Sequence, residues 1–183
     1  MTRNKKIALG LGATLIILYM LRNKIAKSLT NTSFGLLSDQ FFNFIGGLEN
    51  FTPVAEWDEK QWSIGYGSGY NWDEDRAVEQ GDVIDKDTAK RWLLIESQKE
   101  YDKVRSLVTV PITDNQLIAL SSFAYNEGDN ALAKSTLLKL LNSGADENTV
   151  ADQFDRWVYS GNPPKVNKGL VNRRAAEKQL FLS

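Results

Sequence analysis

Residues 49–67, ENFTPVAEWDEKQWSIGYG, mark the point where the sequence changes from a helical to an extended pattern. Before this stretch, apolar side chains recur at the spacing of one helix face: Phe41, Phe42, Ile45 and Leu48. Within it, Trp62, Ile64 and Tyr66 alternate with serine and glycine, which is typical of short strands joined by turns. We therefore expect a helix that ends near Glu49, followed by a small β-hairpin or sheet.

The chain beyond residue 85 is mainly helical in pattern. Asp85, Thr113 and Asp146 each precede an apolar repeat of helical spacing and are suitable N-cap residues, and residues 113–116 (TDNQ) are a capping-box sequence. Residues 160–168 hold one glycine and two prolines and are expected to form a loop before a last helix. This pattern predicts the α+β class: a mainly helical domain with a small β insertion after its first helix.

The N-terminal segment has a different composition. Residues 7–21 are uncharged and mostly apolar, and residues 1–27 carry six lysines and arginines and no acid. As a helix, the uncharged run would span about 22 Å, less than the ~30 Å hydrocarbon core of a bilayer. We expect residues 1–27 to be a marginal, uncleaved membrane anchor with a hydrophobic helix, and residues 28–183 to be a separate domain. A buried core helix is the alternative.

The composition excludes several kinds of chemistry. The chain has no cysteine and no histidine, which removes thiolate zinc sites, cysteine nucleophiles and histidine bases. Residues 28–183 carry a net charge of −7, which does not favour binding to nucleic acid. Any catalysis must therefore use carboxylates, hydroxyls, lysines or arginines.

Three side chains in the first stretch have the chemistry of a glycosidase. Glu49 lies at the end of an apolar helix, where partial desolvation would favour the protonated form that a general acid needs. Asp58 follows nine residues later and Ser63 five residues after that. A proton donor, an ionised carboxylate and a hydroxyl that orients water are the groups that hydrolyse a glycosidic bond, and such enzymes need no metal or organic cofactor.

The spacing of these residues resembles the active-site region of the phage-type lysozymes, glycoside hydrolase family 24. The family pattern is Glu, eight residues, Asp or Cys, five residues, and a Thr that begins T-I-G-Y-G-H. Further segments resemble the family in the same order: residues 110–116 (VPITDNQ), 122–128 (SFAYNEG) and 169–174 (GLVNRR). The resemblance covers about residues 34–183.

The resemblance implies a lysozyme-like fold and muramidase activity, which is cleavage of the β-1,4 bond between N-acetylmuramic acid and N-acetylglucosamine in peptidoglycan. By position, Glu49 would be the proton donor, Asp58 the second carboxylate, and Ser63 the replacement for the threonine that orients water.

The same resemblance suggests four residues for the substrate side of the site. Arg173 would lie against the catalytic glutamate, and Gln116, Tyr125 and Asn126 would line the sugar cleft. For Asn126, a structural role at the end of a helix is an equal expectation.

The chain departs from the family pattern at three points. The interval from Asp58 to Ser63 is one residue short, serine replaces threonine, and Ser68 stands where the family has histidine. If the deletion lies before Asp58 instead of in the following turn, Glu56 or Trp57 takes the second position. Two alternatives then remain: a lytic transglycosylase that uses Glu49 alone, and a non-catalytic peptidoglycan-binding module.

The leading interpretation is a membrane-tethered, monomeric peptidoglycan hydrolase of a bacteriophage or prophage. It would face the periplasm of the host, either as an endolysin or as a virion-associated enzyme. Its partners would be glycan strands and, through residues 7–21, the membrane.

Overall fold

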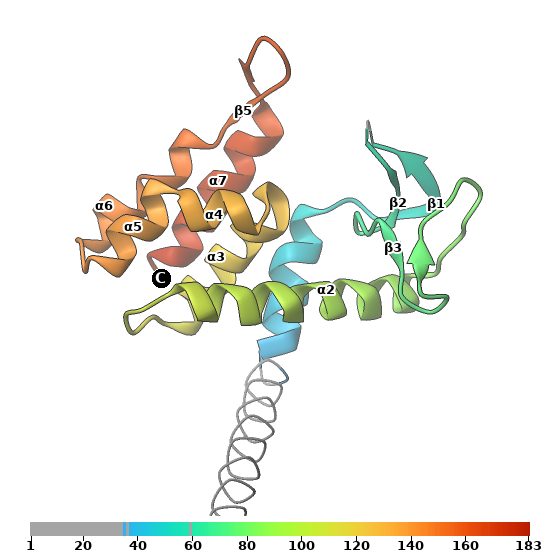
Figure 1. Cartoon of the computed structure of the whole chain (residues 1–183), viewed down its shortest axis with the longest axis horizontal. Helices are drawn as coiled ribbons and strands as arrows, with labels where there is room; N and C mark the ends of the chain where they lie inside the picture. The colour runs from blue at the N-terminus through green and yellow to red at the C-terminus, as the bar shows by residue number, and fades with distance from the viewer. Residues whose placement is uncertain (1–34, 36, 59) are drawn as a thin grey trace, which may run out of the picture. The chain divides into compact units, whose positions relative to one another are not determined.

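The structure is a computed structural model that describes residues 35, 37–58 and 60–183 (Figure 1). The predicted anchor over residues 7–21 and the predicted boundary after residue 27 lie outside the described residues. Within the described part of the chain, no helix is long and apolar enough to cross a membrane. Leu37–Ser183 form one compact unit.

The first described helix covers residues 37–48 and ends where the sequence predicted. Its buried face consists of Leu37, Phe41 and Ile45, which follow one another at intervals of four residues. The Glu49 backbone N–H donates to the Ile45 carbonyl at 3.1 Å, so Glu49 belongs to the last turn.

The predicted β insertion follows at once, as two antiparallel hairpins. Strand β1 (Thr52–Trp57) pairs with β2 (Trp62–Gly65), and β3 (Tyr70–Asn71) pairs with β4 (Arg76–Ala77). In the first hairpin, Glu56 lies opposite Ser63 and Trp57 opposite Trp62, with a register shift nearer the start of β1.

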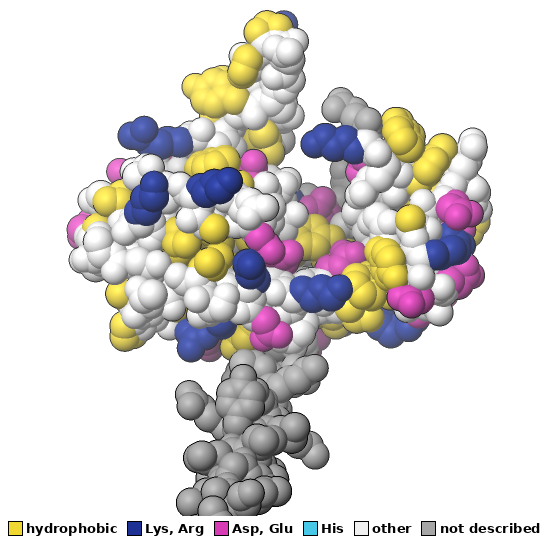
Figure 2. Space-filling model, viewed as in Figure 1, with side chains coloured by type: hydrophobic (Ala, Val, Ile, Leu, Met, Phe, Trp, Pro, Cys, Tyr) yellow, Lys and Arg dark blue, Asp and Glu magenta, His cyan; other side chains and the backbone are white. Residues whose placement is uncertain are grey.

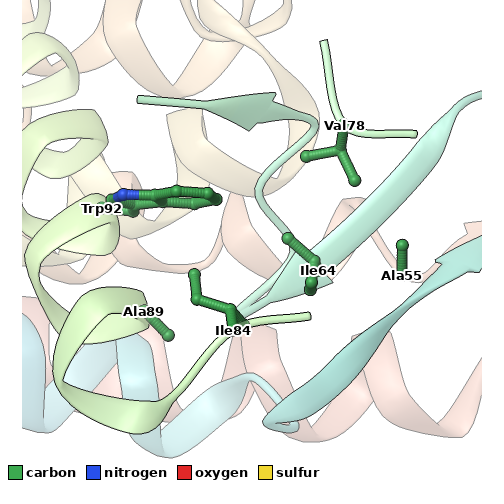
Figure 3. Close-up of a cluster of buried hydrophobic side chains, with 6 residues drawn as sticks. All are labelled: Ala55, Ile64, Val78, Ile84, Ala89 and Trp92. Atoms are coloured by element: carbon green, nitrogen blue, oxygen red, sulfur yellow. The ribbon is translucent and has the colours of Figure 1, made fainter. Parts of the chain in front are cut away.

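A small apolar core joins this β region to the helix after it. Ala55, Ile64, Val78 and Ile84 pack with Ala89 and Trp92 of helix α2 (Lys86–Leu107), as Figure 3 shows. The Gly65 backbone has φ of +70°, and a Cβ there would come within 3.0 Å of the Ala89 Cβ. The end of β2 therefore approaches α2 so closely that only glycine fits without displacement.

The remaining helices form the larger part of the domain. They are α3 (Asp114–Glu127), α4 (Asp129–Lys134), α5 (Thr136–Asn142), α6 (Glu147–Ala151), the short 3₁₀ helix η1 (Phe154–Arg156) and α7 (Lys168–Phe181). Helix α3 begins with the predicted capping box of Thr113 and Gln116 and is buried along most of its length, and α7 packs along it. Helix α2 runs from beneath the β region to the helical part (Figure 1).

The loop predicted over residues 160–168 contains a short hairpin. Strand β5 (Tyr159–Ser160) pairs with β6 (Lys165–Val166), and both strands are exposed. The glycine and prolines that predicted a loop supply its turn, and the strands are too short to give an alternating sequence pattern. The hairpin projects from the helical part of the molecule (Figure 1).

Candidate active site

Glu49 is held from the side by an arginine on the last helix. Arg173 Nη1 lies 2.5 Å from Glu49 Oε1, which makes a charge-assisted hydrogen bond between residues 124 positions apart. The Arg173 side chain is 8% exposed, whereas that of Glu49 is 24% exposed. One face of the Glu49 carboxyl group is therefore fixed by the protein, and the group is still accessible to a ligand.

Behind this pair lies a cluster of buried polar groups. Arg173 Nε donates to Glu177 Oε1 at 3.2 Å, and Arg173 Nη2 donates to the Ser122 carbonyl at 3.2 Å. The Ser122 hydroxyl donates to the same Glu177 oxygen at 2.7 Å. Arg174 Nη1 lies 3.2 Å from the other Glu177 oxygen, Oε2. Sequence reasoning missed Glu177 and Ser122, although the spacing of four residues from Arg173 to Glu177 puts both on one helix face.

Burial dominates the electrostatics of this cluster. It raises the pKa of Glu177, while the charges of Arg174 and Arg173 and the Ser122 hydroxyl act in the opposite direction. Burial also lowers the pKa of Arg174, against the attraction of Glu177 and Glu127. The cluster therefore depends on mutual pairing to keep its charges inside the protein.

Tyr125 and Asn126 lie at the C-terminal end of α3, near this cluster. The Tyr125 hydroxyl lies 3.1 Å from the Tyr66 carbonyl and 3.0 Å from Glu96 Oε2. Burial raises the pKa of Tyr125, and the charges of Glu96 and Glu49 add to the effect, so Tyr125 is within electrostatic range of Glu49. Asn126 is exposed, and its Oδ1 accepts a hydrogen bond from Arg174.

Glu96 on α2 connects the β region to α3, which the sequence did not reveal. Besides the Tyr125 hydroxyl, its carboxylate accepts the Ser68 hydroxyl at 2.5 Å and the Trp72 indole N–H at 3.0 Å. Ser68 stands where the family pattern has histidine, and here it makes a contact that joins the turn after β2 to α2. Ser68 therefore makes a polar link between the β region and α2.

Asp58 and Ser63 are placed differently from Glu49. Asp58 is exposed in the turn of the first hairpin, and its Oδ1 accepts the backbone N–H groups of Lys60 at 3.4 Å and Gln61 at 3.2 Å. Ser63 is half-buried and lies opposite Glu56 in the strand register. Among the described residues, no hydrogen bond joins Asp58 or Ser63 to Glu49.

Gln116 is not brought to Glu49. It lies at the opposite end of α3 from Tyr125 and Asn126, about 15 Å away along the helix axis. Its Oε1 accepts the Thr113 backbone N–H at 3.0 Å, and its Nε2 donates to Glu147 at 3.2 Å. Both amide atoms are therefore used in capping α3 and in binding α6.

The surface of the domain is concave on one face. Figure 2 shows it hollowed between the β region and the helical part, with acidic side chains gathered along the hollow. Within the part of the chain that the structure describes, no group of acidic side chains is arranged to hold a metal ion.

A helical domain with a small antiparallel insertion, and a glutamate at the junction of the two, defines a lysozyme-like fold. The family model described as phage lysozyme matches residues 46–177, and the chain belongs to that family.

Three relatives illustrate the range of the similarity. The endolysin of Bacillus phage B103 is 42% identical over 125 residues, which are 68% of this chain and 44% of that protein. The SAR-endolysin of Escherichia phage Mu is 43% identical over 81 residues, 44% of this chain and 46% of its own length. A crystal structure of a P22 lysozyme variant superposes with a TM-score of 0.68 at 31% identity, covering 79% of this chain and 96% of that one. The matched region thus spans less than half of the two endolysins.

Proposed function

We propose that this chain is a peptidoglycan hydrolase that cleaves the β-1,4 bond between N-acetylmuramic acid and N-acetylglucosamine for a bacteriophage or prophage. The observation that carries the proposal is the position of Glu49: partly exposed at the end of its helix, and fixed on one side by a buried arginine. Membership of the phage lysozyme family and similarity to several phage endolysins support it.

In the proposed reaction, protonated Glu49 donates its proton to the glycosidic oxygen as the bond to the leaving sugar breaks. The carboxylate that forms is stabilised by Arg173, whose guanidinium already lies 2.5 Å from Oε1. The remaining exposed part of the carboxyl group faces the ligand. Asn126, at the adjacent end of α3, contacts the sugars through its exposed amide, and the neighbouring Tyr125 contributes its partly exposed side chain, since its hydroxyl is engaged by Tyr66 and Glu96.

Asp58 is the proposed second carboxylate and Ser63 the proposed hydroxyl for the water molecule. The shorter hairpin leaves a second possibility, because Glu56 lies opposite Ser63 in the strand register. Opposed residues of an antiparallel pair lie on one face of the sheet, so Glu56 is a competing candidate for the carboxylate that acts with Ser63. Gln116 is left out of the proposed sugar contacts, because its amide is bonded to Thr113 and Glu147.

A lytic transglycosylase is the second candidate. It is favoured by the position of Asp58, whose carboxylate is bound to the backbone of its own turn. In that mechanism Glu49 acts alone, and the C6 hydroxyl of muramic acid attacks C1 within the same sugar. The product is a 1,6-anhydro sugar in place of a reducing end.

The products of digestion test the proposal. Purified peptidoglycan is digested with the full chain and with Glu49→Gln, and the fragments are analysed by mass spectrometry. We expect muramic acid reducing ends from the wild type and none from the variant. Anhydro ends that require Glu49 would support the transglycosylase. If neither protein releases fragments while both are folded and bind peptidoglycan, the chain is a binding module. Glu79→Gln, an exposed acid in the β region, is the matched control and should behave as the wild type.

We also propose that residues 7–21 tether the enzyme to a membrane, facing the periplasm. The uncharged run between two groups of cations supports this, as does the similarity to the SAR-endolysin of phage Mu. Replacing Gly10 and Gly12 with leucine lengthens the strongly apolar run and should retain the protein in the membrane fraction and delay lysis. This expectation belongs to a tether that is weak enough to leave the membrane later and so start lysis, and unchanged fractionation and unchanged timing of lysis would contradict such a release.

A further inference from the structure

Three charged side chains on α7 are buried although the proposed reaction uses only one of them. Arg174 and Glu177 are 0% exposed and Arg173 is 7% exposed. Removing a charge from water costs several kcal/mol unless partners replace the solvent. The cluster lies next to the proposed proton donor. Its burial therefore suggests a function that charges exposed to solvent could not have.

We propose that Glu177 is a positioning residue: it fixes the guanidinium of Arg173 and offsets its charge, and so sets the pH range in which Glu49 donates its proton. This inference rests on the proposed function, in which Glu49 is the general acid. It assigns to Glu177 a role that acts through Arg173 and involves no contact with the substrate.

The hydrogen bonds of Arg173 support the positioning role. The planar guanidinium is held at three places: Nη1 on Glu49, Nε on Glu177 and Nη2 on the Ser122 carbonyl. The Ser122 hydroxyl also donates to Glu177, which closes a ring of bonds between α3 and α7. Because the donors of arginine are in fixed directions, the bonds on one edge determine where the opposite edge points. Glu177 and Ser122 thus orient Nη1 toward Glu49.

The balance of charges supports the second part of the role. Two cations, Arg173 and Arg174, face three carboxylates: Glu49 and Glu177, and Glu127, which pairs with Arg174. Without Glu177, the charge of Arg173 would act on Glu49 alone and would favour the carboxylate form of Glu49, which cannot donate a proton. With Glu177 in place, Arg173 divides its interaction between two carboxylates.

Other charged and titratable groups surround the cluster. From α3, Tyr125 interacts with the charge of Glu49, and Glu127 Oε1 lies 3.7 Å from Arg174 Nη2. The Arg174 guanidinium also lies over the Phe123 ring at 4.8 Å. Tyr125 stays neutral over the pH range of the measurement, because burial raises its pKa above its usual value of 10. Glu127 is present in the wild type and in both test variants, so its charge contributes equally to all three proteins. These groups therefore do not reverse the expected effect.

The test compares two variants that remove opposite charges from the same buried cluster. In the full chain, Glu177→Gln removes a negative charge and Arg174→Gln removes a positive one. The measurement is the pH profile of kcat/KM on peptidoglycan, whose alkaline limb reports loss of the proton from the general acid of the free enzyme. We expect the limb to move to lower pH by about one unit in Glu177→Gln and to higher pH in Arg174→Gln.

Both substitutions disturb the same packing, so a purely structural role would lower activity in both without moving the limbs apart. The inference would be overturned if the alkaline limbs of the two variants stay at the wild-type position, or if both move in the same direction. Glu177→Asp keeps the charge and should keep the wild-type limb, with a reduced kcat because the shorter side chain orients Arg173 less well. If Glu177→Gln does not fold, Arg174→Gln alone decides, since the inference requires its limb to rise.

The outcome is separable from that of the proposed function. If Glu49→Gln retains activity, the proposed function fails. If Glu49→Gln is inactive and the limbs do not separate, only the role of Glu177 is lost.

Discussion

The two sides of the candidate site are held in different ways. Behind Glu49, Arg173 and Glu177 are buried and joined to Ser122 by bonds between residues more than 50 positions apart. On the hairpin, Asp58 is exposed and its carboxylate bonds to backbone N–H groups two and three residues away. The first side is determined by the tertiary fold and the second by a local turn.

This difference suggests how the site divides its tasks. Proton donation needs a carboxyl group whose environment is fixed, and the α3–α7 cluster provides that environment for Glu49. The side chains that position the water molecule can be held less rigidly. They lie on the hairpin, where the chain is one residue shorter than the family pattern. We therefore expect substitutions on the α7 side to affect both stability and activity, and those on the hairpin to affect activity alone.

The largest effect is expected when Arg173 is replaced. Arg173→Met leaves Glu177 buried without one of its two arginine partners and should lower the free energy of unfolding by about 3–5 kcal/mol. Activity should fall on the order of 100-fold because Glu49 loses the cation that stabilises its carboxylate. Urea unfolding and peptidoglycan digestion measure the two effects.

The double variant Arg173→Met with Glu177→Met separates these effects. Replacing the buried pair with apolar side chains should restore part of the stability without restoring the activity, because Arg174 loses Glu177 but keeps Glu127 and Asn126 as partners. Recovery of both properties together would mean that the cluster serves packing alone.

A second prediction concerns the hairpin and compares its two acids. Asp58→Asn should lower kcat by about 100-fold with little change in the melting temperature, because the side chain is exposed. Glu56→Gln makes the same change of charge two residues earlier, on strand β1, and should change kcat by less than about threefold. The reverse order would assign the second carboxylate to Glu56, opposite Ser63.

The sequence predicted those parts of the molecule that depend on neighbouring residues. The helix ending at Glu49, the insertion after it, and the capping box of Thr113 and Gln116 are all local patterns, and the structure contains each of them. The α+β class followed from the same patterns.

The contacts of the site were less predictable. The bonds of Glu177 to Ser122, and of Glu96 to Ser68 and Tyr125, join residues 28 or more positions apart, where no periodic pattern acts. The sequence did not determine which acidic residue lies opposite Ser63, for another reason. A difference of one residue in the length of a hairpin changes which side chains lie opposite each other. Gln116 matched the family by position, yet its amide atoms bond within the protein.

A smaller effect is expected from restoring the family residue on the hairpin. Ser63→Thr adds a methyl group that restricts the rotation of the hydroxyl, and kcat should rise by about twofold. Ser63→Ala removes the hydroxyl and should lower kcat with unchanged KM. Equal activity of all three proteins would exclude the hydroxyl from the reaction.

The smallest effect on activity is expected at Glu100 of α2, a half-buried acid that contrasts with Glu177 because its neighbour is another carboxyl group. Burial and the Asp129 carboxyl raise the pKa of Glu100 from 4.5 to about 8. A pKa raised on folding gives stability that is complete below pH 4.5 and is lost as the pH rises through about 8.

Glu100→Gln removes this titration. Its melting temperature should match that of the wild type near pH 5 and exceed it near pH 9, while its activity at pH 6 is unchanged. Parallel melting curves for the two proteins across this range would show that Glu100 does not titrate in it.

The most direct test of the whole account is digestion of peptidoglycan in H₂¹⁸O, with immediate borohydride reduction of the fragments and mass spectrometry. We expect one ¹⁸O atom at each newly formed muramic acid end with the wild type, and no new ends with Glu49→Gln. Unlabelled anhydro ends, or labelled ends that form without Glu49, would contradict it.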